Sequence, residues 1–283
     1  MTQYKNITVN GLNIFYREAG DPKNPAILLL HGFPTSSHMF RNLIANLEDK
    51  YYLVAPDFPG FGYSSMPRVE EFDYSFDNLS VITENFINAI GLEKFSMYVM
   101  DYGAPVGYRI AERNPEKIQA LLVQNGNAYE EGLTDFWTPI FKYWKNPTHT
   151  EEVATMLLPE STRWQYVNGV QDETKISPDN WQHDQSLLDR PGNREIQLQL
   201  FLSYGTNPPL YPKWQAYFRK YQPPTLITWG ANDAIFPPSG AHPYKRDLQN
   251  VDFHLLDTGH FALEDHHQEI SSLIDQFLQK NLH

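Results

Sequence analysis

The sequence contains no cysteine. A disulfide framework, a cysteine nucleophile, a thiolate metal site and an iron–sulfur cluster are therefore excluded. Basic residues are also scarce, because 22 Lys and Arg stand against 34 Asp and Glu and leave a net charge of −12. This balance argues against nucleic acid or an anionic membrane surface as a partner, since both attract cationic proteins.

Long apolar segments and targeting signals are missing as well. The longest purely aliphatic stretch near the start covers residues 26–30, far short of the roughly 20 residues that span a bilayer. The N-terminal segment has no basic region followed by an apolar one. An apolar fraction of 41% is nevertheless ample for a buried core at this length. We therefore expect a folded, cytoplasmic protein without a membrane partner, as a monomer or homodimer.

Short apolar runs, each closed by glycine, proline or a polar residue, recur along the chain. They occupy residues 26–30, 51–57, 95–101, 119–127, 224–233 and 251–260. Such runs are typical of parallel strands that are buried on both faces of a sheet. Between them, apolar residues recur at helical spacing in segments 39–47, 75–91 and 267–282. This alternation predicts an α/β fold with a mostly parallel, doubly wound sheet.

One long region interrupts the alternation. Residues 128–222 contain no buried-strand run, and segments such as 136–146 and 193–205 have helical patterns. We interpret this region as a helical cap, or lid, inserted into a core formed by residues 1–127 and 223–283. Ligands of open α/β sheets bind beyond the carboxyl ends of the strands, so an insertion at this point would cover the site.

Polar residues stand where the apolar runs end. They are His31, Asp57, Asp101, Asn125, Asp233 and His260. Asp101, Asp233 and His260 form a chemically complete set, because nucleophilic catalysis needs a nucleophile, a base and a carboxylate that orients the base. Asn125 and Asn127 follow a strand run but cannot ionise, so Asp233 is the expected orienting acid.

The turn at Asp101 is the most informative of these. Small residues follow it at Gly103, Ala104 and Gly107, which permits a tight turn from strand to helix that exposes the intervening side chain. Serine hydrolases carry Ser at this position, but here it is Asp, and no G-x-S-x-G occurs elsewhere. An ordinary helix N-cap is the alternative interpretation of Asp101.

Five motifs in order along the chain resemble those of α/β-hydrolases that use an Asp nucleophile, namely epoxide hydrolases and haloalkane dehalogenases. The motifs are HGFP at 31–34, DFPGFG at 57–62, DYG at 101–103, GAND at 230–233 and GHF at 259–261. The resemblance covers essentially the whole expected core. It implies an α/β-hydrolase fold that needs no cofactor and no metal.

The resemblance also implies roles for individual residues. Asp101 attacks an electrophilic carbon of a small apolar substrate and becomes an alkyl ester. His260, oriented by Asp233, then activates the water that hydrolyses this ester. The backbone N–H groups of Phe33 and Tyr102 form the oxyanion hole. His31 and Pro34 support the loop that carries this hole.

The leaving group decides between the two activities. Epoxide hydrolases of this kind protonate the departing alkoxide with two lid tyrosines, for which Tyr204 and Tyr143 are the candidates and Tyr166 and Tyr211 the reserves. We therefore expect an epoxide hydrolase that forms vicinal diols.

Haloalkane dehalogenase is the alternative. Two features count against it. Tyr102 and Phe33 stand where dehalogenases carry halide donors. Fluoroacetate-type dehalogenases also clamp the substrate carboxylate with an Arg beside the nucleophile, whereas Arg109 is two helical turns away from Asp101. Val99, the DFPGFG segment and the lid tryptophans favour the dehalogenase, and Trp144 is counted among the supporting residues of the site. The tryptophans in question are Trp137, Trp144, Trp164 and Trp181. A non-catalytic ligand-binding homologue is a third reading, disfavoured by the complete Asp–His–Asp set.

Overall fold

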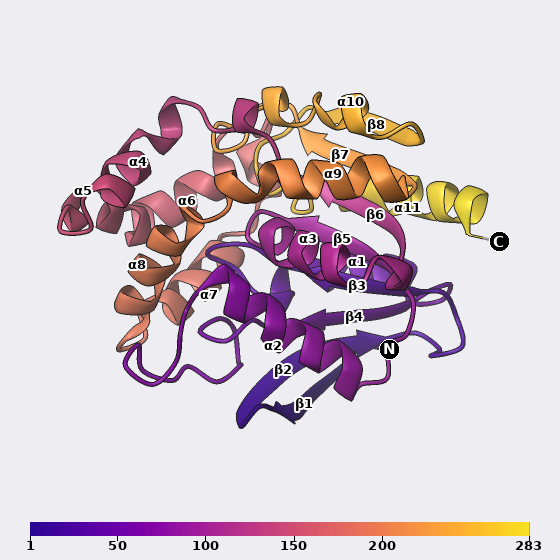
Figure 1. Cartoon of the computed structure of the whole chain (residues 1–283), viewed down its shortest axis with the longest axis horizontal. Helices are drawn as coiled ribbons and strands as arrows, with labels where there is room; N and C mark the ends of the chain where they lie inside the picture. Colours follow the sequence, from indigo (N-terminus) through magenta and orange to yellow (C-terminus); the bar gives the residue numbers. More distant parts are fainter. Residues whose placement is uncertain (283) are drawn as a thin grey trace.

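The computed structural model describes residues 1–282, and its centre is an eight-stranded sheet in the order β1-β2-β4-β3-β5-β6-β7-β8 (Figure 1). The strands are β1 Gln3–Val9, β2 Leu12–Ala19, β3 Ala26–Leu30, β4 Tyr52–Pro56, β5 Phe95–Met100, β6 Ile118–Gln124, β7 Thr225–Gly230 and β8 Val251–Leu256. β1 and β2 pair antiparallel, as do β2 and β4, whereas all other neighbours are parallel. The predicted α/β fold with a mostly parallel sheet is confirmed.

Helices cover both faces of the sheet and enclose two apolar clusters. One face is covered by α2 Phe76–Ala89, α3 Gly103–Arg113 and α10 Tyr244–Asp247, and the other by α1 Arg41–Leu47 and α11 His267–Asn281. The central strands are buried on both faces because both layers of helices pack against them.

The segment between β6 and β7 consists of helices joined by turns and loops, and its residues contain no strand. Its helices are α4 Thr138–Lys145, α5 Thr150–Ala154, α6 Pro159–Val167, α7 Pro178–Leu188, α8 Asn193–Tyr204 and α9 Tyr211–Tyr221. In Figure 1, α4 to α8 lie beyond the ends at which the parallel strands finish. The last helix, α9, instead packs along α3 of the core, where Tyr108 contacts Trp214 and Phe218.

Two local expectations were wrong. The helix expected over residues 39–47 is divided, because a 3₁₀ turn over Ser37–Phe40, capped by the Ser36 hydroxyl, precedes α1. The last strand, β8, is buried only at Leu256 among its six residues. It lies at the edge of the sheet and pairs only with β7, so its apolar pattern does not reflect burial on both faces.

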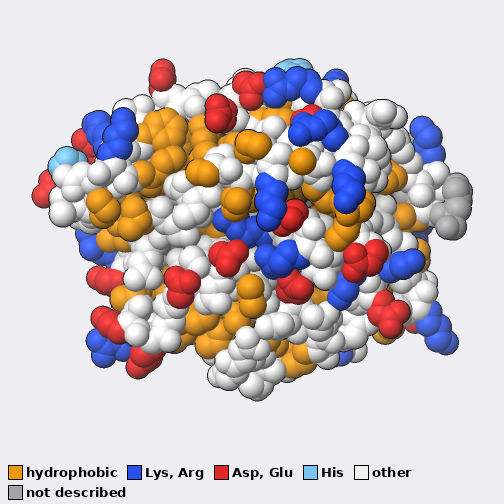
Figure 2. Space-filling view, viewed as in Figure 1, with side chains coloured by type: hydrophobic (Ala, Val, Ile, Leu, Met, Phe, Trp, Pro, Cys, Tyr) orange, Lys and Arg blue, Asp and Glu red, His pale blue; other side chains and the backbone are white. Residues whose placement is uncertain are grey.

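The surface mixes charges of both signs. Basic and acidic side chains are interspersed over the face seen in Figure 2, and ion pairs such as Arg246–Glu131 and Lys213–Glu112 join neighbouring elements. Within residues 1–282, no helix is both long and apolar enough to cross a bilayer.

Candidate active site

The turn after β5 holds Asp101 in a strained conformation. Its φ angle of 48° lies in the left-handed region, which costs a non-glycine residue about 1–2 kcal/mol and is common at functional sites. Close packing explains the small neighbours: a Cβ on Gly103 would lie 2.1 Å from the Leu30 carbonyl oxygen, and one on Gly32 would lie 2.4 Å from the Asp101 Cβ. The turn therefore packs closely against the end of β3 and the loop after it, and this packing leaves no room for a larger residue at either glycine.

The Asp101 carboxylate faces the loop after β3 and does not cap its own helix. No side chain caps the N-terminus of α3, and the Phe33 N–H donates a hydrogen bond of 2.7 Å to Asp101 Oδ1. Burial raises the pKa of Asp101 above 3.8, while His260 and the N–H groups of Phe33 and Tyr102 act in the opposite direction. Both predicted oxyanion-hole groups thus lie at the carboxylate.

His31 supports this loop from below. Its Nε2 accepts a hydrogen bond of 3.1 Å from the Phe58 N–H, and its Nδ1 lies 3.0 Å from the Gly32 carbonyl oxygen. Burial lowers the pKa of His31 to about 4, so the ring is neutral near pH 7. Pro34 is buried in the same loop.

His260 and Asp233 come from the loops after β8 and β7 and meet beside Asp101. His260 Nδ1 lies 2.7 Å from Asp233 Oδ2, and both side chains are almost fully buried. Burial alone would lower the pKa of His260, but the carboxylates of Asp233 and Asp101 more than offset it and raise the pKa above 6.5. Within residues 1–282, His260 Nε2 has no hydrogen-bond partner. A ring held by one nitrogen and free at the other can accept a proton from water.

Asn125 is a positioning residue whose role the sequence did not predict. Its Nδ2 donates a hydrogen bond of 2.7 Å to Asp233 Oδ2, and its Oδ1 accepts one of 3.0 Å from the Gly230 N–H. Asp233 Oδ1 in turn accepts from the Ile235 N–H at 2.7 Å. A polar residue directly after an apolar strand was the available signal, but the contact depends on β6 and β7 being neighbours.

A small cavity of about 80 Å³ opens above Asp101 between core and lid. The core contributes Phe33, Asp101, Tyr102 and Ile235 to its lining, and the segment between β6 and β7 contributes mostly aromatic and aliphatic side chains. Such a cavity suits an apolar small molecule whose reactive carbon lies against the carboxylate.

Neither of the two predicted lid tyrosines is among the residues that line this cavity. Tyr204, at the end of α8, packs against Tyr102 and Trp137 with ring centroids 5.9 and 4.6 Å apart. Burial, with smaller contributions from Tyr211 and Asp101, raises the pKa of Tyr204 well above 10. Tyr143 is buried in α4. Their role as proton donors stays a prediction.

The reserve tyrosines and two of the tryptophans have other partners. The Tyr166 hydroxyl donates to Asp184, and the Tyr211 hydroxyl accepts from Asn127 Nδ2 at 3.1 Å. The indole N–H groups of Trp137 and Trp144 donate to the backbone carbonyls of Ile235 and Phe201, at 2.9 and 2.8 Å. Neither indole N–H is therefore free to hold a halide.

Of the remaining lid tryptophans, Trp164 lines the cavity and stacks on Phe136, whereas Trp181 lies under the Arg163 guanidinium and is not among the lining residues.

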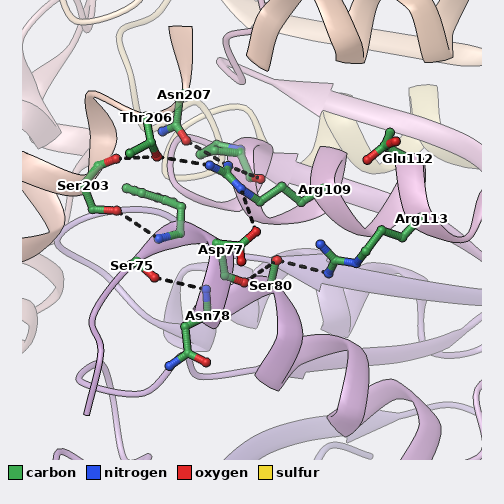
Figure 3. A network of polar contacts seen from close by, with 12 residues as sticks. Ser75, Asp77, Asn78, Ser80, Arg109, Glu112, Arg113, Ser203, Thr206 and Asn207 are labelled. Atoms are coloured by element: carbon green, nitrogen blue, oxygen red, sulfur yellow. Dashed lines mark hydrogen bonds and ion pairs between the residues drawn. The ribbon is translucent and has the colours of Figure 1, made fainter. Parts of the chain in front are cut away.

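Arg109 is committed to a network that joins lid and core (Figure 3). Its guanidinium donates to Asn207 Oδ1 at 2.8 Å, to Thr206 Oγ1 at 3.2 Å and to the Pro105 carbonyl oxygen at 3.0 Å. In the same network the Ser203 hydroxyl accepts from the backbone N–H of Phe76 in α2. These bonds fix the end of α8, and they leave Arg109 unavailable to bind a substrate carboxylate.

An eight-stranded, mostly parallel sheet, a strained turn that presents a carboxylate, and an Asp–His pair at neighbouring strand ends together define an α/β hydrolase. The sequence model of the alpha/beta hydrolase fold family matches residues 25–151. The uncharacterized hydrolase YNR064C of Saccharomyces cerevisiae is 44% identical over 278 residues, which cover 96% of this chain and 95% of the yeast protein. The chain therefore belongs to the α/β-hydrolase family.

Haloalkane dehalogenases are among the other proteins to which the chain is similar. A haloalkane dehalogenase of Mesorhizobium japonicum is 26% identical over 275 residues, covering 93% of this chain and 87% of the relative. The crystal structure of the haloalkane dehalogenase DbeA of Bradyrhizobium elkani has a TM-score of 0.84 at 20% identity and covers 99% of this chain and 98% of that chain. At this identity the structural likeness supports the fold alone.

Proposed function

We propose that this hydrolase uses Asp101 as a nucleophile toward carbon and that its substrates are small apolar epoxides, which it converts to vicinal diols. The observation that carries the proposal is the orientation of the Asp101 carboxylate. Its Oδ1 is held at 2.7 Å by the Phe33 N–H, which leaves Oδ2 to attack. An acid–base set without a serine or cysteine nucleophile favours carbon electrophiles, because the resulting ester is cleaved by water next to a base.

The reaction balances in two steps. Asp101 Oδ2 donates an electron pair to an epoxide carbon, the carbon–oxygen bond breaks, and the alkoxide takes a proton from a lid donor. His260 Nε2 then removes a proton from water, and the hydroxide adds to the ester carbonyl carbon. The oxyanion on Oδ1 accepts the N–H groups of Phe33 and Tyr102, each worth about 2.7–4 kcal/mol in the transition state. Collapse of this intermediate breaks the Cγ–Oδ2 bond, and the departing alkoxide takes the proton held on His260 and leaves as the diol. The proton of the new carboxylic acid returns through solvent to the lid donor, which restores Asp101, His260 and the donor.

The choice of leaving group rests on the donors near the cavity. Tyr204 packs against Tyr102, the residue after Asp101, with ring centroids 5.9 Å apart, and its hydroxyl stays neutral because burial raises its pKa well above 10. The indoles of Trp137 and Trp144 are already hydrogen-bonded to carbonyl oxygens, and Tyr102 stands in the place of a halide-binding indole. Haloalkane dehalogenation is the second candidate, supported by the Mesorhizobium japonicum relative. A non-catalytic binder is disfavoured by the paired Asp233 and His260 beside Asp101.

A covalent-trapping experiment tests the proposal. Wild type and His260→Gln are incubated with an aryl epoxide and with a bromoalkane, and diol, bromide and intact protein mass are measured. The His260→Gln variant should accumulate an ester with the epoxide, because its first step remains and its second step lacks the base. Asp101→Ala is the control and should gain no mass. If neither compound modifies His260→Gln, the proposed Asp101 nucleophile is wrong.

The proton donor is tested separately. Tyr204→Phe should slow epoxide opening about 10²- to 10⁴-fold, the usual contribution of a general acid. It should leave bromide release unchanged, because halide needs no proton. Tyr143→Phe is the matched variant on α4, and comparing the two identifies which tyrosine donates. Equal epoxide rates in wild type and both variants would remove the tyrosines from the mechanism.

A further inference from the structure

One polar side chain in the cavity is not used by the proposed chemistry. Gln165 in α6 is only 6% exposed and lines the cavity together with Asp101. Within residues 1–282, no hydrogen bond joins its amide to another group, and both amide atoms remain accessible to a molecule the size of water. Gln165 is therefore a cavity-lining residue whose amide has no partner in the protein.

Among the neighbouring polar groups the Tyr102 hydroxyl also lacks a partner within residues 1–282, whereas others are paired. The Ser161 hydroxyl, which also lines the cavity, donates to the Thr155 carbonyl oxygen at 2.7 Å. Gln185 on the next helix is fully engaged: its Oε1 accepts from Thr162, and its Nε2 donates to the Leu157 carbonyl oxygen and to Asp189. A buried amide without a partner costs about 1–3 kcal/mol, so Gln165 is costly unless a ligand or water pairs with it.

Helix geometry holds Gln165 toward the cavity. Ser161, Trp164 and Gln165 are spaced three and four residues apart and share the cavity face of α6. Thr162 and Tyr166 share a different face and donate hydrogen bonds to Gln185 and Asp184 of α7. Because these bonds fix the rotation of α6, the Cα–Cβ bond of Gln165 stays on the face of the helix that lines the cavity.

We propose that the Gln165 amide is a specificity determinant that binds an oxygen-bearing substituent of the substrate, on the side remote from the carbon that Asp101 attacks. This rests on the proposed function. Gln165 belongs to α6 and Asp101 to the turn after β5, so the two polar groups reach an otherwise mainly apolar cavity from different elements of the fold. A hydroxyl satisfies both the donor and the acceptor of the amide. The substrate class is therefore an apolar epoxide with a distal hydroxyl group.

A matched pair of substrates tests the assignment. The probes are 4-(hydroxymethyl)phenyl oxirane and 4-ethylphenyl oxirane, which have the same number of heavy atoms. We compare kcat/KM for wild type, Gln165→Leu and Gln165→Met, with Ile140→Val as a control that alters the same cavity without changing its hydrogen bonds. The two Gln165 variants differ in shape, so that failure of one to fold leaves the other.

Wild type should prefer the hydroxymethyl substrate by at least about tenfold, and Gln165→Leu and Gln165→Met should lose this preference by lowering kcat/KM for that substrate alone. Ile140→Val should shift both substrates alike. Equal losses on both substrates in the Gln165 variants, or no preference in wild type, would overturn the proposal.

A binding measurement keeps this result separate from the proposed chemistry. Quenching of tryptophan fluorescence by 1,4-benzenedimethanol and by 4-ethylbenzyl alcohol reports affinity without reaction, because Trp164 lines the cavity. If wild type hydrolyses neither oxirane, the epoxide proposal fails, and the binding pair still decides the role of Gln165. Tighter binding of the diol that disappears in Gln165→Met supports it, and equal binding overturns it.

Discussion

Asn125 offers the sharpest quantitative test of how the site is held. In Asn125→Ala, Asp233 loses the hydrogen bond of 2.7 Å that the amide donates, and the buried Gly230 N–H loses its acceptor at 3.0 Å. A hydrogen bond to a charged group contributes about 1.5–3 kcal/mol, and an unpaired buried N–H costs about 1–3 kcal/mol. The φ angle of Asn125 is 45°, and an alanine there adds about 1 kcal/mol of strain. We therefore expect a loss of roughly 4 kcal/mol in the free energy of unfolding.

That loss is a large part of the roughly 5–15 kcal/mol that stabilises a protein domain. It corresponds to a fall in Tm of about 10 °C for a chain of this size. Thermal unfolding followed by circular dichroism measures it, and kcat should fall as well because Asp233 is no longer held against His260. A Tm within 2 °C of wild type would refute the argument.

Asn125→Asp is the matched control. It keeps an acceptor for the Gly230 N–H and a side chain that tolerates the left-handed conformation, but it places a second carboxyl group against Asp233. Two adjacent carboxylates hold a proton to higher pH than the unfolded chain does, whose Asp pKa is near 3.9. The stability of Asn125→Asp relative to wild type should therefore fall as pH rises from 5 to 8. A constant difference across this range would show that the contact to Asp233 does not form.

Three further predictions concern the nucleophile, the lid and the base. In Gly32→Ala the new Cβ lies 2.6 Å from Asp101 Oδ1, so the nucleophile must move and adduct formation should slow about 100-fold; a rate within threefold of wild type would contradict this. In Arg109→Met the residues after α8, Asn207 and Thr206, lose their hydrogen bonds to the core. Limited proteolysis should therefore cut the lid faster, and KM should rise. An unchanged digestion pattern would show that Arg109 does not hold the lid to the core. The raised pKa of His260 means that, as the pH falls, the ring takes up a proton at a pH above 6.5. Because the protonated ring cannot act as a base, kcat should fall about tenfold per pH unit below that pKa. A flat profile down to pH 5.5 would exclude His260 as the base.

The core and its reacting groups could be predicted because they follow from local signals and one general rule. Apolar runs that end in Asp101, Asp233 and His260 mark strand ends, and parallel strands bring their carboxyl ends to one edge of the sheet. The tight turn was visible in Gly103, two residues after Asp101, and the structure shows why glycine is needed at that position. These inferences needed no knowledge of side-chain packing.

The surroundings of the site could not be predicted in the same way. The role of Asn125 depends on the order of strands in the sheet, which no local pattern specifies. The face that a lid helix turns to the cavity depends on contacts between short helices, as the bonds from α6 to α7 illustrate. For this reason the sequence suggested Tyr143 and Tyr204, whereas Gln165 lines the cavity without having been singled out.

The hydrogen bond between Asn125 and Asp233 has a consequence for how this enzyme can change over generations. The chain leaves the sheet after β6 and returns at the start of β7, which pairs with β6, and this bond joins the point of departure to the loop after β7 that carries the acid. The acid is thus held by a residue at the end of β6, where the helical segment begins, and the segment itself takes no part in this bond. Its interior can be rewritten, lengthened or exchanged with that of a relative while the acid, the base and the nucleophile keep their places. Substrate range can therefore diverge quickly on an unchanged reaction centre.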